Sequence, residues 1–149
     1  MLDLIIKNGS CYIDKDLKDQ DIAIKDGKII KIGKIDSEAK ETFDAKGLTV
    51  LPGCIDTQTH FREPGSTDTE DLHSGSRAAI VGGITSVFEM PNTNPPTSTK
   101  VEFQKKLDLA KNRMYCNYAF YFGATADNAS ELADLVNLEG CCGIKLFAG

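Results

Sequence analysis

The feature that most constrains the fold is a regular alternation, after Leu48, of apolar runs with segments of helical spacing. Short apolar runs that alternate with helical segments are typical of strands buried on both faces, as in a parallel sheet. The expected strands lie near residues 49–56, 85–90, 114–122 and 143–147. Helices are expected at residues 66–81, 101–112 and 130–137, with Gly82 and Gly83 ending the first and Ser98 or Thr99 capping the second.

This order of strands and helices fits either an open doubly wound sheet or a (β/α)₈ barrel. No G-x-G-x-x-G fingerprint follows the first strand, which argues against a dinucleotide-binding sheet. In each repeat the polar and ionisable residues gather where the strand ends, and barrel enzymes place their active sites there. We therefore predict an α/β chain with a partial TIM (β/α) barrel of about four of the eight strands.

The first fifty residues indicate a different kind of structure. Short β runs at residues 2–7, 9–13, 21–25 and 28–32 predict antiparallel strands, and Asp26-Gly27 is a strong hairpin turn. Strands of this size suit a small β-sandwich-like segment. The predicted division is a β-rich arm at residues 1–50 and the barrel segment at residues 51–149.

Composition narrows the classes of partner. The formal net charge of -5 is mildly acidic, whereas nucleic acids and anionic membranes attract basic patches, so neither partner is expected. No apolar run approaches the roughly 20 residues of a membrane span, and the N-terminus lacks the pattern of a signal peptide, so we expect a cytoplasmic protein. Five cysteines without a C-x-x-C pair predict neither a disulfide framework nor a zinc knuckle. We interpret Cys141 and Cys142 as small buried hydrophobic residues.

Three motifs point to a family. The segment PGCIDTQTHFREPG at residues 52–65 resembles the first-strand motif of dihydroorotases, cyclic amidohydrolases of the amidohydrolase superfamily. EMPNTNPPT at residues 89–97 and GIKLFAG at residues 143–149 agree with that branch, and the strand-rich start resembles its N-terminal arm. The resemblance therefore spans the whole chain.

The same motif suggests a metal site. Residues two apart on a strand point to one side, so positions 58 and 60 are expected to share a face while Thr57 and Thr59 face away. Two imidazoles there would form half of a zinc site. His60 supplies one of them, but position 58 is Gln58, whose carboxamide oxygen is a weak, uncharged donor. The resemblance further implies that Lys145, in an apolar strand, is the lysine that some relatives carboxylate to bridge two metal ions.

The resemblance also implies roles for other polar residues. Arg62 and Asn92 would bind the carboxylate of dihydroorotate or carbamoyl-aspartate, a task that suits the planar guanidinium fork. Asp56 would support the geometry of the metal site, and His73, inside the first expected helix, is interpreted as structural. Relatives take two more histidines and a general-base aspartate from later strands, so we assign no catalytic residue within these 149 residues.

The function expected from the resemblance is zinc-dependent hydrolysis of a cyclic amide, dihydroorotate to N-carbamoyl-aspartate in pyrimidine biosynthesis, by a chain that is truncated and inactive alone. Hydantoins and allantoin remain open as substrates. Gln58 also fits a non-catalytic homologue that acts as a structural partner of aspartate carbamoyltransferase, and a decayed gene fragment is a third alternative. We predict that Gln58, His60 and Arg62 point into one cavity, with Lys145 across from them and Asn92 on its rim.

Overall fold

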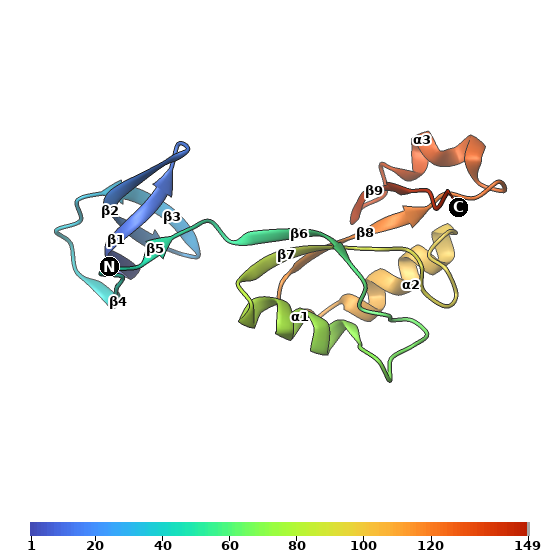
Figure 1. The fold of residues 1–149 in the computed structure, drawn as a ribbon, viewed down its shortest axis with the longest axis horizontal. Helices are drawn as coiled ribbons and strands as arrows, with labels where there is room; N and C mark the ends of the chain where they lie inside the picture. Colours follow the sequence, from blue (N-terminus) through green and yellow to red (C-terminus); the bar gives the residue numbers. More distant parts are fainter. Residues whose placement is uncertain (149) are drawn as a thin grey trace. The chain divides into compact units, whose positions relative to one another are not determined.

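The computed structural model describes residues 1–148, which fall into two compact units, Met1–Pro52 and a second unit that starts at Gly53 (Figure 1). The division lies two residues after the predicted one. Each unit has its own sheet and its own hydrophobic core.

The first unit is a five-stranded sheet in the order β3-β2-β1-β4, with β5 also paired to β1. The predicted hairpin at Asp26-Gly27 is confirmed, because both residues have positive φ, 51° and 70°, and they join two antiparallel strands. The core of the unit is formed by Ile5, Ala23 and Ile35. The strands are β1 (Leu2–Ile13), β2 (Asp16–Lys25), β3 (Lys28–Gly33), β4 (Ala39–Asp44) and β5 (Thr49–Val50).

Three expectations for this unit need correction. Residues 2–7 and 9–13 form one strand with a register shift, because Asn8 adopts a φ of 60° and interrupts the pairing. The unit is not wholly antiparallel, since β4 and β5 both run parallel to β1. Thr49 and Val50 pair with β1, so they do not begin the first barrel strand.

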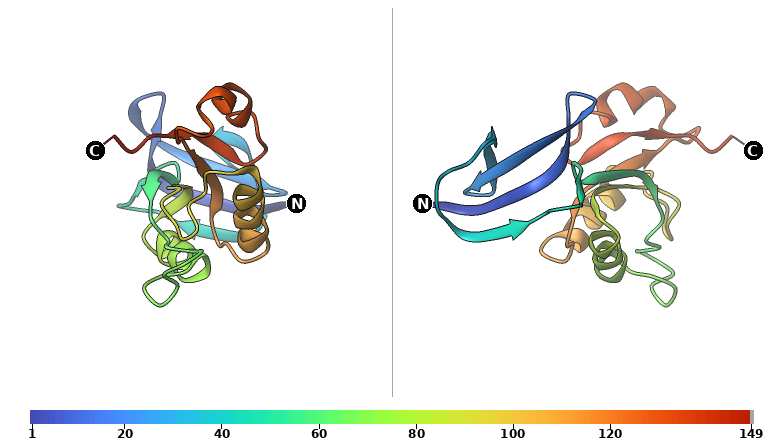
Figure 2. Two further views of the ribbon diagram at one scale, coloured as in Figure 1. Left: turned by 90° about the vertical axis from the view of Figure 1, so that its right-hand side faces the viewer. Right: turned by 60° about the vertical axis from the view of Figure 1, so that its left-hand side comes forward.

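The second unit is a four-stranded parallel sheet in the order β6-β7-β8-β9, and the predicted parallel pairing of its strands is confirmed. Figure 2 shows the sheet curled, with the helices on its convex side. This is an α/β fold consistent with part of a TIM barrel. Its elements are β6 (Cys54–Thr59), α1 (Leu72–Val81), β7 (Ile84–Glu89), α2 (Lys100–Ala110), β8 (Asn117–Gly123), the 3₁₀ turn η1 (Ala129–Glu131), α3 (Leu132–Leu135) and β9 (Cys141–Lys145).

The ends of the helices follow their capping residues. Helix α1 begins at Leu72, six residues later than predicted, because Asp71 forms a capping box with Ser74 and ends the preceding turn. Gly82 is its C-cap, as predicted. Thr99 caps α2 and accepts the N–H of Glu102. Helix α3 has only four residues, shorter than the segment 130–137 expected.

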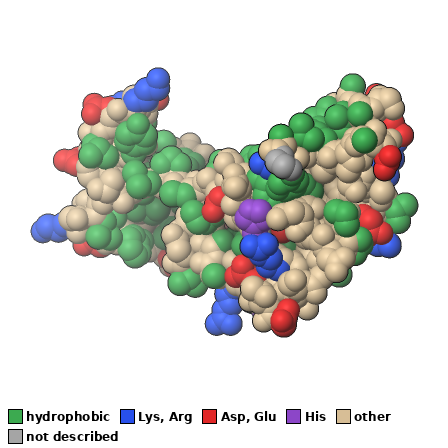
Figure 3. Space-filling view, turned by 45° about the vertical axis from the view of Figure 1, so that its right-hand side comes forward, with side chains coloured by type: hydrophobic (Ala, Val, Ile, Leu, Met, Phe, Trp, Pro, Cys, Tyr) green, Lys and Arg blue, Asp and Glu red, His purple; other side chains and the backbone are tan. Residues whose placement is uncertain are grey.

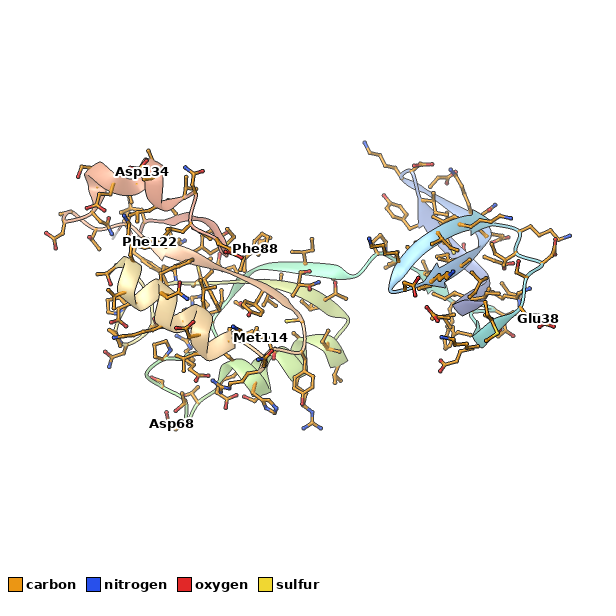
Figure 4. All side chains as sticks on the ribbon, turned by 180° about the vertical axis from the view of Figure 1, so that it is seen from behind. Glu38, Asp68, Phe88, Met114, Phe122 and Asp134 are labelled. Atoms are coloured by element: carbon orange, nitrogen blue, oxygen red, sulfur yellow. The ribbon has the colours of Figure 1, made fainter. Side chains whose placement is uncertain are left out.

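The core of the second unit lies between the helices and the sheet. Phe122, labelled in Figure 4, is 1% exposed and belongs to this core. The other buried members are Phe61, Leu72, Val87, Phe103, Ala110, Cys116, Phe120 and Leu135. None of the helices within residues 1–148 is long and apolar enough to cross a membrane.

Candidate functional site at the ends of the parallel strands

The carboxyl end of β6 contains an irregularity that exposes two neighbouring side chains. Between Asp56 and Thr59, β6 advances one residue more than β7, which is the signature of a β-bulge. The Asp56 carboxylate accepts the N–H of Gln58 at 2.9 Å inside this bulge. The expected strict alternation is therefore wrong here: Thr57 and Gln58 are both exposed, whereas Thr59 is buried.

His60 and Asn92 meet where β6 and β7 end. His60 Nδ1 lies 2.9 Å from Asn92 Oδ1. Because a carboxamide oxygen only accepts hydrogen bonds, Nδ1 must carry the proton in this pair. The lone pair of Nε2 is then available to a metal ion or a proton donor. Asn92, expected on the rim as a ligand for the substrate, is thus the partner of the histidine.

The loops that follow β6 and β7 are held against each other at both ends. Met90 donates its N–H to Thr59 O at 3.0 Å, and Asn94 donates its N–H to Pro64 O at the same distance. Gly65 packs so closely that a Cβ atom there would lie 2.8 Å from Asn94 Cβ. This clamp fixes the spacing between His60 and Asn92.

A buried ion pair lies behind these loops. Glu89 and Lys106 are 1% and 0% exposed, and the Glu89 carboxylate contacts Lys106 Nζ directly. Burial raises the pKa of Glu89 and lowers the pKa of Lys106, while the charge of each partner opposes the shift. Glu89 Oε1 accepts the N–H of Phe61 at 3.2 Å, and Lys106 Nζ donates to Met90 O at 3.0 Å.

A second ion pair anchors the loop that follows β6. Arg113 binds both carboxylate oxygens of Glu63, at 2.7 and 3.1 Å, and this partner is the main reason that the pKa of Arg113 is raised. Glu63 Oε2 also accepts the N–H of Leu72 at 2.9 Å, at the start of α1. Glu63 is therefore structural, and it anchors the loop that carries Arg62.

Arg62 is exposed between two buried neighbours and has a φ of 63°. Strand geometry cannot align it with His60, because β6 ends at Thr59. Its charge lowers the pKa of the Glu89 carboxyl only as a minor contribution. The arginine thus lies near this end of the sheet without a fixed partner among the described residues.

Lys145 lies on the face of the sheet that turns away from the helices, here called the open face. Phe88 and Tyr121 define this face by an edge-on ring contact at 6.5 Å, and Gly143 packs against Tyr121. Lys145 is two residues after Gly143, so it shares the open face, and it is half-buried rather than enclosed. Its Nζ lies 5.3 Å from the centre of the Phe147 ring.

We place His60 on the open face as well, because Phe61 belongs to the core on the helix side and the buried Thr59 pairs with Glu89, which contacts Lys106 of α2. Figure 3 shows histidine, cationic and hydrophobic side chains together at the surface of this unit. Phe88, labelled in Figure 4, lies on β7 opposite the bulge of β6. His73 lies elsewhere, on α1, where its Nε2 is 3.2 Å from Tyr115 Oη.

The described residues do not form a metal centre by themselves. No group of three or more His, Cys, Asp and Glu side chains able to hold a metal ion occurs within residues 1–148. The open face offers the His60 imidazole and the Lys145 amine, and Gln58, exposed in the bulge of β6, has only a weak carboxamide donor. Burial, and then the neighbouring Cys141, raise the pKa of Cys142 to about 12, so this thiol is protonated near neutral pH.

Sequence reasoning overlooked Glu63, Glu89, Lys106 and Arg113. A signal was present for two of them. Glu89 ends an apolar strand, and Lys106 falls on the apolar stripe of α2 between Phe103 and Ala110. A charged residue on the buried side of two adjacent elements indicates an ion pair between them.

Comparison with known proteins shows what this chain is similar to. Residues 49–139 match the profile described as the amidohydrolase family. The allantoinase of Escherichia coli O1:K1 is 41% identical over 146 residues, which cover 97% of this chain and 32% of that protein. The chain therefore spans about a third of the length of the curated relatives that it matches.

Solved structures show the same relationship. The L-hydantoinase (dihydropyrimidinase) from Arthrobacter aurescens superposes with a TM-score of 0.87 at 34% identity, covering 97% of this chain and 32% of that one. A D-hydantoinase from Thermus sp. superposes with a TM-score of 0.72 at 27% identity, covering 89% and 31%. Both matched chains are about three times as long as the present one.

Proposed function

The chain belongs to the amidohydrolase family, and from this premise we propose that its second unit contributes part of the active site of a cyclic amide hydrolase. The observation that carries the proposal is the pairing of His60 with Asn92 where two adjacent parallel strands end. Active sites of barrel enzymes are built at that end. Lys145 shares the open face with His60, which supports one common site rather than two.

The substrate is proposed from the names of the relatives. They are an allantoinase and hydantoinases, so allantoin and hydantoin rings are the first candidates. Dihydroorotate is a second candidate because the exposed Arg62 could pair with its carboxylate. Asn92 uses its oxygen for His60, and its NH₂ group remains a suitable donor to a substrate oxygen.

Members of this family are generally metal-dependent. We propose that His60 Nε2 contacts the metal ion, which we expect to be zinc, with Gln58 and a carboxylated Lys145 as weaker or conditional ligands. Carboxylation adds CO₂ to a neutral amine and releases a proton, so it turns Lys145 into an oxygen donor. Because the donors found here are incomplete, we assign no reaction step to the metal.

A chimera tests this function. The chain would replace the matched 146 residues of the Escherichia coli allantoinase, once as it stands and once as Gln58→His. We expect the Gln58→His chimera to open at least one of the three rings, and the Gln58 chimera to be slower by about 10–100-fold or more. His60→Asn in the active chimera is the control and should abolish turnover. A folded, metal-loaded Gln58→His chimera that hydrolyses none of the three rings would refute the proposal.

Gln58 supports a second candidate from another class. A carboxamide in place of an imidazole weakens a zinc site, as expected for a non-catalytic homologue that serves as a structural partner, for instance of aspartate carbamoyltransferase. Co-purification with that transcarbamoylase, together with absence of zinc in the purified protein, would favour this role. Stoichiometric zinc without any bound transcarbamoylase would favour the hydrolase.

A further inference from the structure

We infer that Glu89 and Lys106 are positioning residues whose contact holds the loops after β6 and β7 in register and so fixes the tautomer of His60. The inference rests on the proposed function, in which His60 Nε2 is the atom that serves the site. Neither residue reaches the open face, and both act through the backbone of their neighbours.

The contacts run from the ion pair to each member of the His60–Asn92 pair. Glu89 Oε1 accepts the N–H of Phe61, the residue directly after His60, at 3.2 Å. Lys106 Nζ donates to the carbonyl oxygen of Met90, two residues before Asn92, at 3.0 Å. The contact between Glu89 and Lys106 therefore connects the two loops on the helix side of the sheet. The hydrogen bond between the His60 imidazole and the Asn92 amide connects the same two loops on the open face.

Stability alone does not explain such a pair. Two charges at 1% and 0% exposure carry a desolvation penalty, and well-packed apolar side chains of similar volume often do as well or better. Lys106 Nζ also lies 5.0 Å from the centre of the Phe120 ring, so the site already has apolar surroundings. What an apolar pair could not supply is one acceptor for Phe61 N–H and one donor to Met90 O.

The tautomer of His60 can be measured directly by NMR. The chain contains two histidines, so the second one can serve as a reference. With ¹⁵N-labelled histidine at about pH 8, where a free imidazole is neutral, nitrogen shifts report which ring atom carries the proton. In the wild type we expect His60 to be protonated at Nδ1. His73 is bonded to Tyr115 on another element and serves as the internal reference.

The variants are Lys106→Met and the double variant Glu89→Leu/Lys106→Met. Both remove anchors of the loops, but only the single variant leaves a buried charge unpaired, so the double variant should resist urea better. In both variants we expect His60 to exchange between its two tautomers, so that the chemical shifts of its two ring nitrogens converge. The nitrogen shifts of His73 should stay unchanged. The matched control is Lys105→Met on the same helix, where an exposed lysine pairs with Glu102. This control should leave both histidines as in the wild type.

A folded double variant with wild-type His60 shifts would overturn the inference, and so would equal changes at His60 and His73, which indicate general loosening. If neither variant folded, the pair would be a requirement of the fold and the positioning role would be rejected. A mixed tautomer in the wild type would refute the inference by itself. The proposed hydrolase is judged separately, by turnover of the chimera.

Discussion

Gly65 lies where the loops after β6 and β7 approach each other closely. Its φ is 120°, and a Cβ atom would meet Asn94 Cβ at 2.8 Å and Asn94 O at 3.0 Å. We predict that Gly65→Ala lowers the free energy of unfolding by about 1–3 kcal/mol through backbone strain and this clash. Urea titration followed by circular dichroism measures the change.

Gly83 supplies the control for this prediction. Its φ of 84° is also positive, but no atom lies within 4 Å of the position of a Cβ. Gly83→Ala therefore carries backbone strain without a clash and should cost less than Gly65→Ala. Equal losses in the two variants would show that the close approach of the loops contributes nothing.

The role of some single residues could be predicted from the sequence, whereas the role of others could not. His60 and Asn92 were identified as candidate site residues because they follow apolar strands within recognisable motifs, but their hydrogen bond was not predicted. The hydrogen bond depends on the conformation of the loop after each strand, and the periodicity of apolar residues does not predict that conformation. The pairing of Glu89 with Lys106 does not follow from the pattern of either element alone, because a buried charge is accommodated only together with its partner on another element.

Asp71 sets the start of α1, and its charge makes the helix sensitive to acid. Its pKa is lowered mainly by the N–H of Ser74 and then by the Ser74 hydroxyl, with a smaller contribution from Arg113. A carboxyl whose pKa is lower in the folded state stabilises the fold above the unfolded pKa of about 3.9, and this stabilisation is lost as the pH falls through the folded pKa. We predict that the wild type is more stable than Asp71→Ala near neutral pH and that this advantage shrinks below about pH 4.

Asp71→Asn separates the cap from the charge. Asparagine also caps helices but does not titrate, so its advantage over Asp71→Ala should not depend on pH. Urea titrations at several pH values between about 3 and 7 would give both differences. An advantage of the wild type that stayed constant down to pH 3 would contradict the assigned pKa direction.

Whole elements were predicted better than their ends. The four parallel strands and the cap at Thr99 agree with the sequence pattern, because strands of a parallel sheet have nearly continuous apolar runs. The bulge in β6 was not predicted, since one extra residue changes which side chains are exposed without altering composition. Helix α1 starts later than predicted because its N-cap is Asp71 and not one of the polar residues before it.

At the scale of the whole molecule, the sequence indicated the family and the α/β fold, while the substrate remained open. Motifs that resemble those of dihydroorotases occur in this chain, which is also similar to an allantoinase and to hydantoinases. Substrate choice depends on the shape and the donors of a complete pocket. The open face described here supplies only part of one, so the motifs could not distinguish these rings.

We predict that this chain alone does not cyclise carbamoyl-aspartate or open the three candidate rings, and that Gln58→His alone does not change this. Loss of a general base costs roughly 10²–10⁴-fold, and an incomplete metal site compounds the loss. The measurement is turnover with added zinc for both chains against a control without protein. Turnover that is proportional to protein and abolished by a chelator would contradict the prediction.

We propose that positions 58 and 60 present their side chains to one metal site on the open face. Zinc titration by calorimetry tests it most directly, on the wild type, Gln58→His, His60→Asn and the double variant. If the two imidazoles share one ion, Gln58→His should tighten zinc binding by about tenfold or more, equivalent to about 1.4 kcal/mol, and this gain should vanish when His60 is replaced. An unchanged affinity in Gln58→His, or an equal gain with and without His60, would contradict a metal site shared by positions 58 and 60.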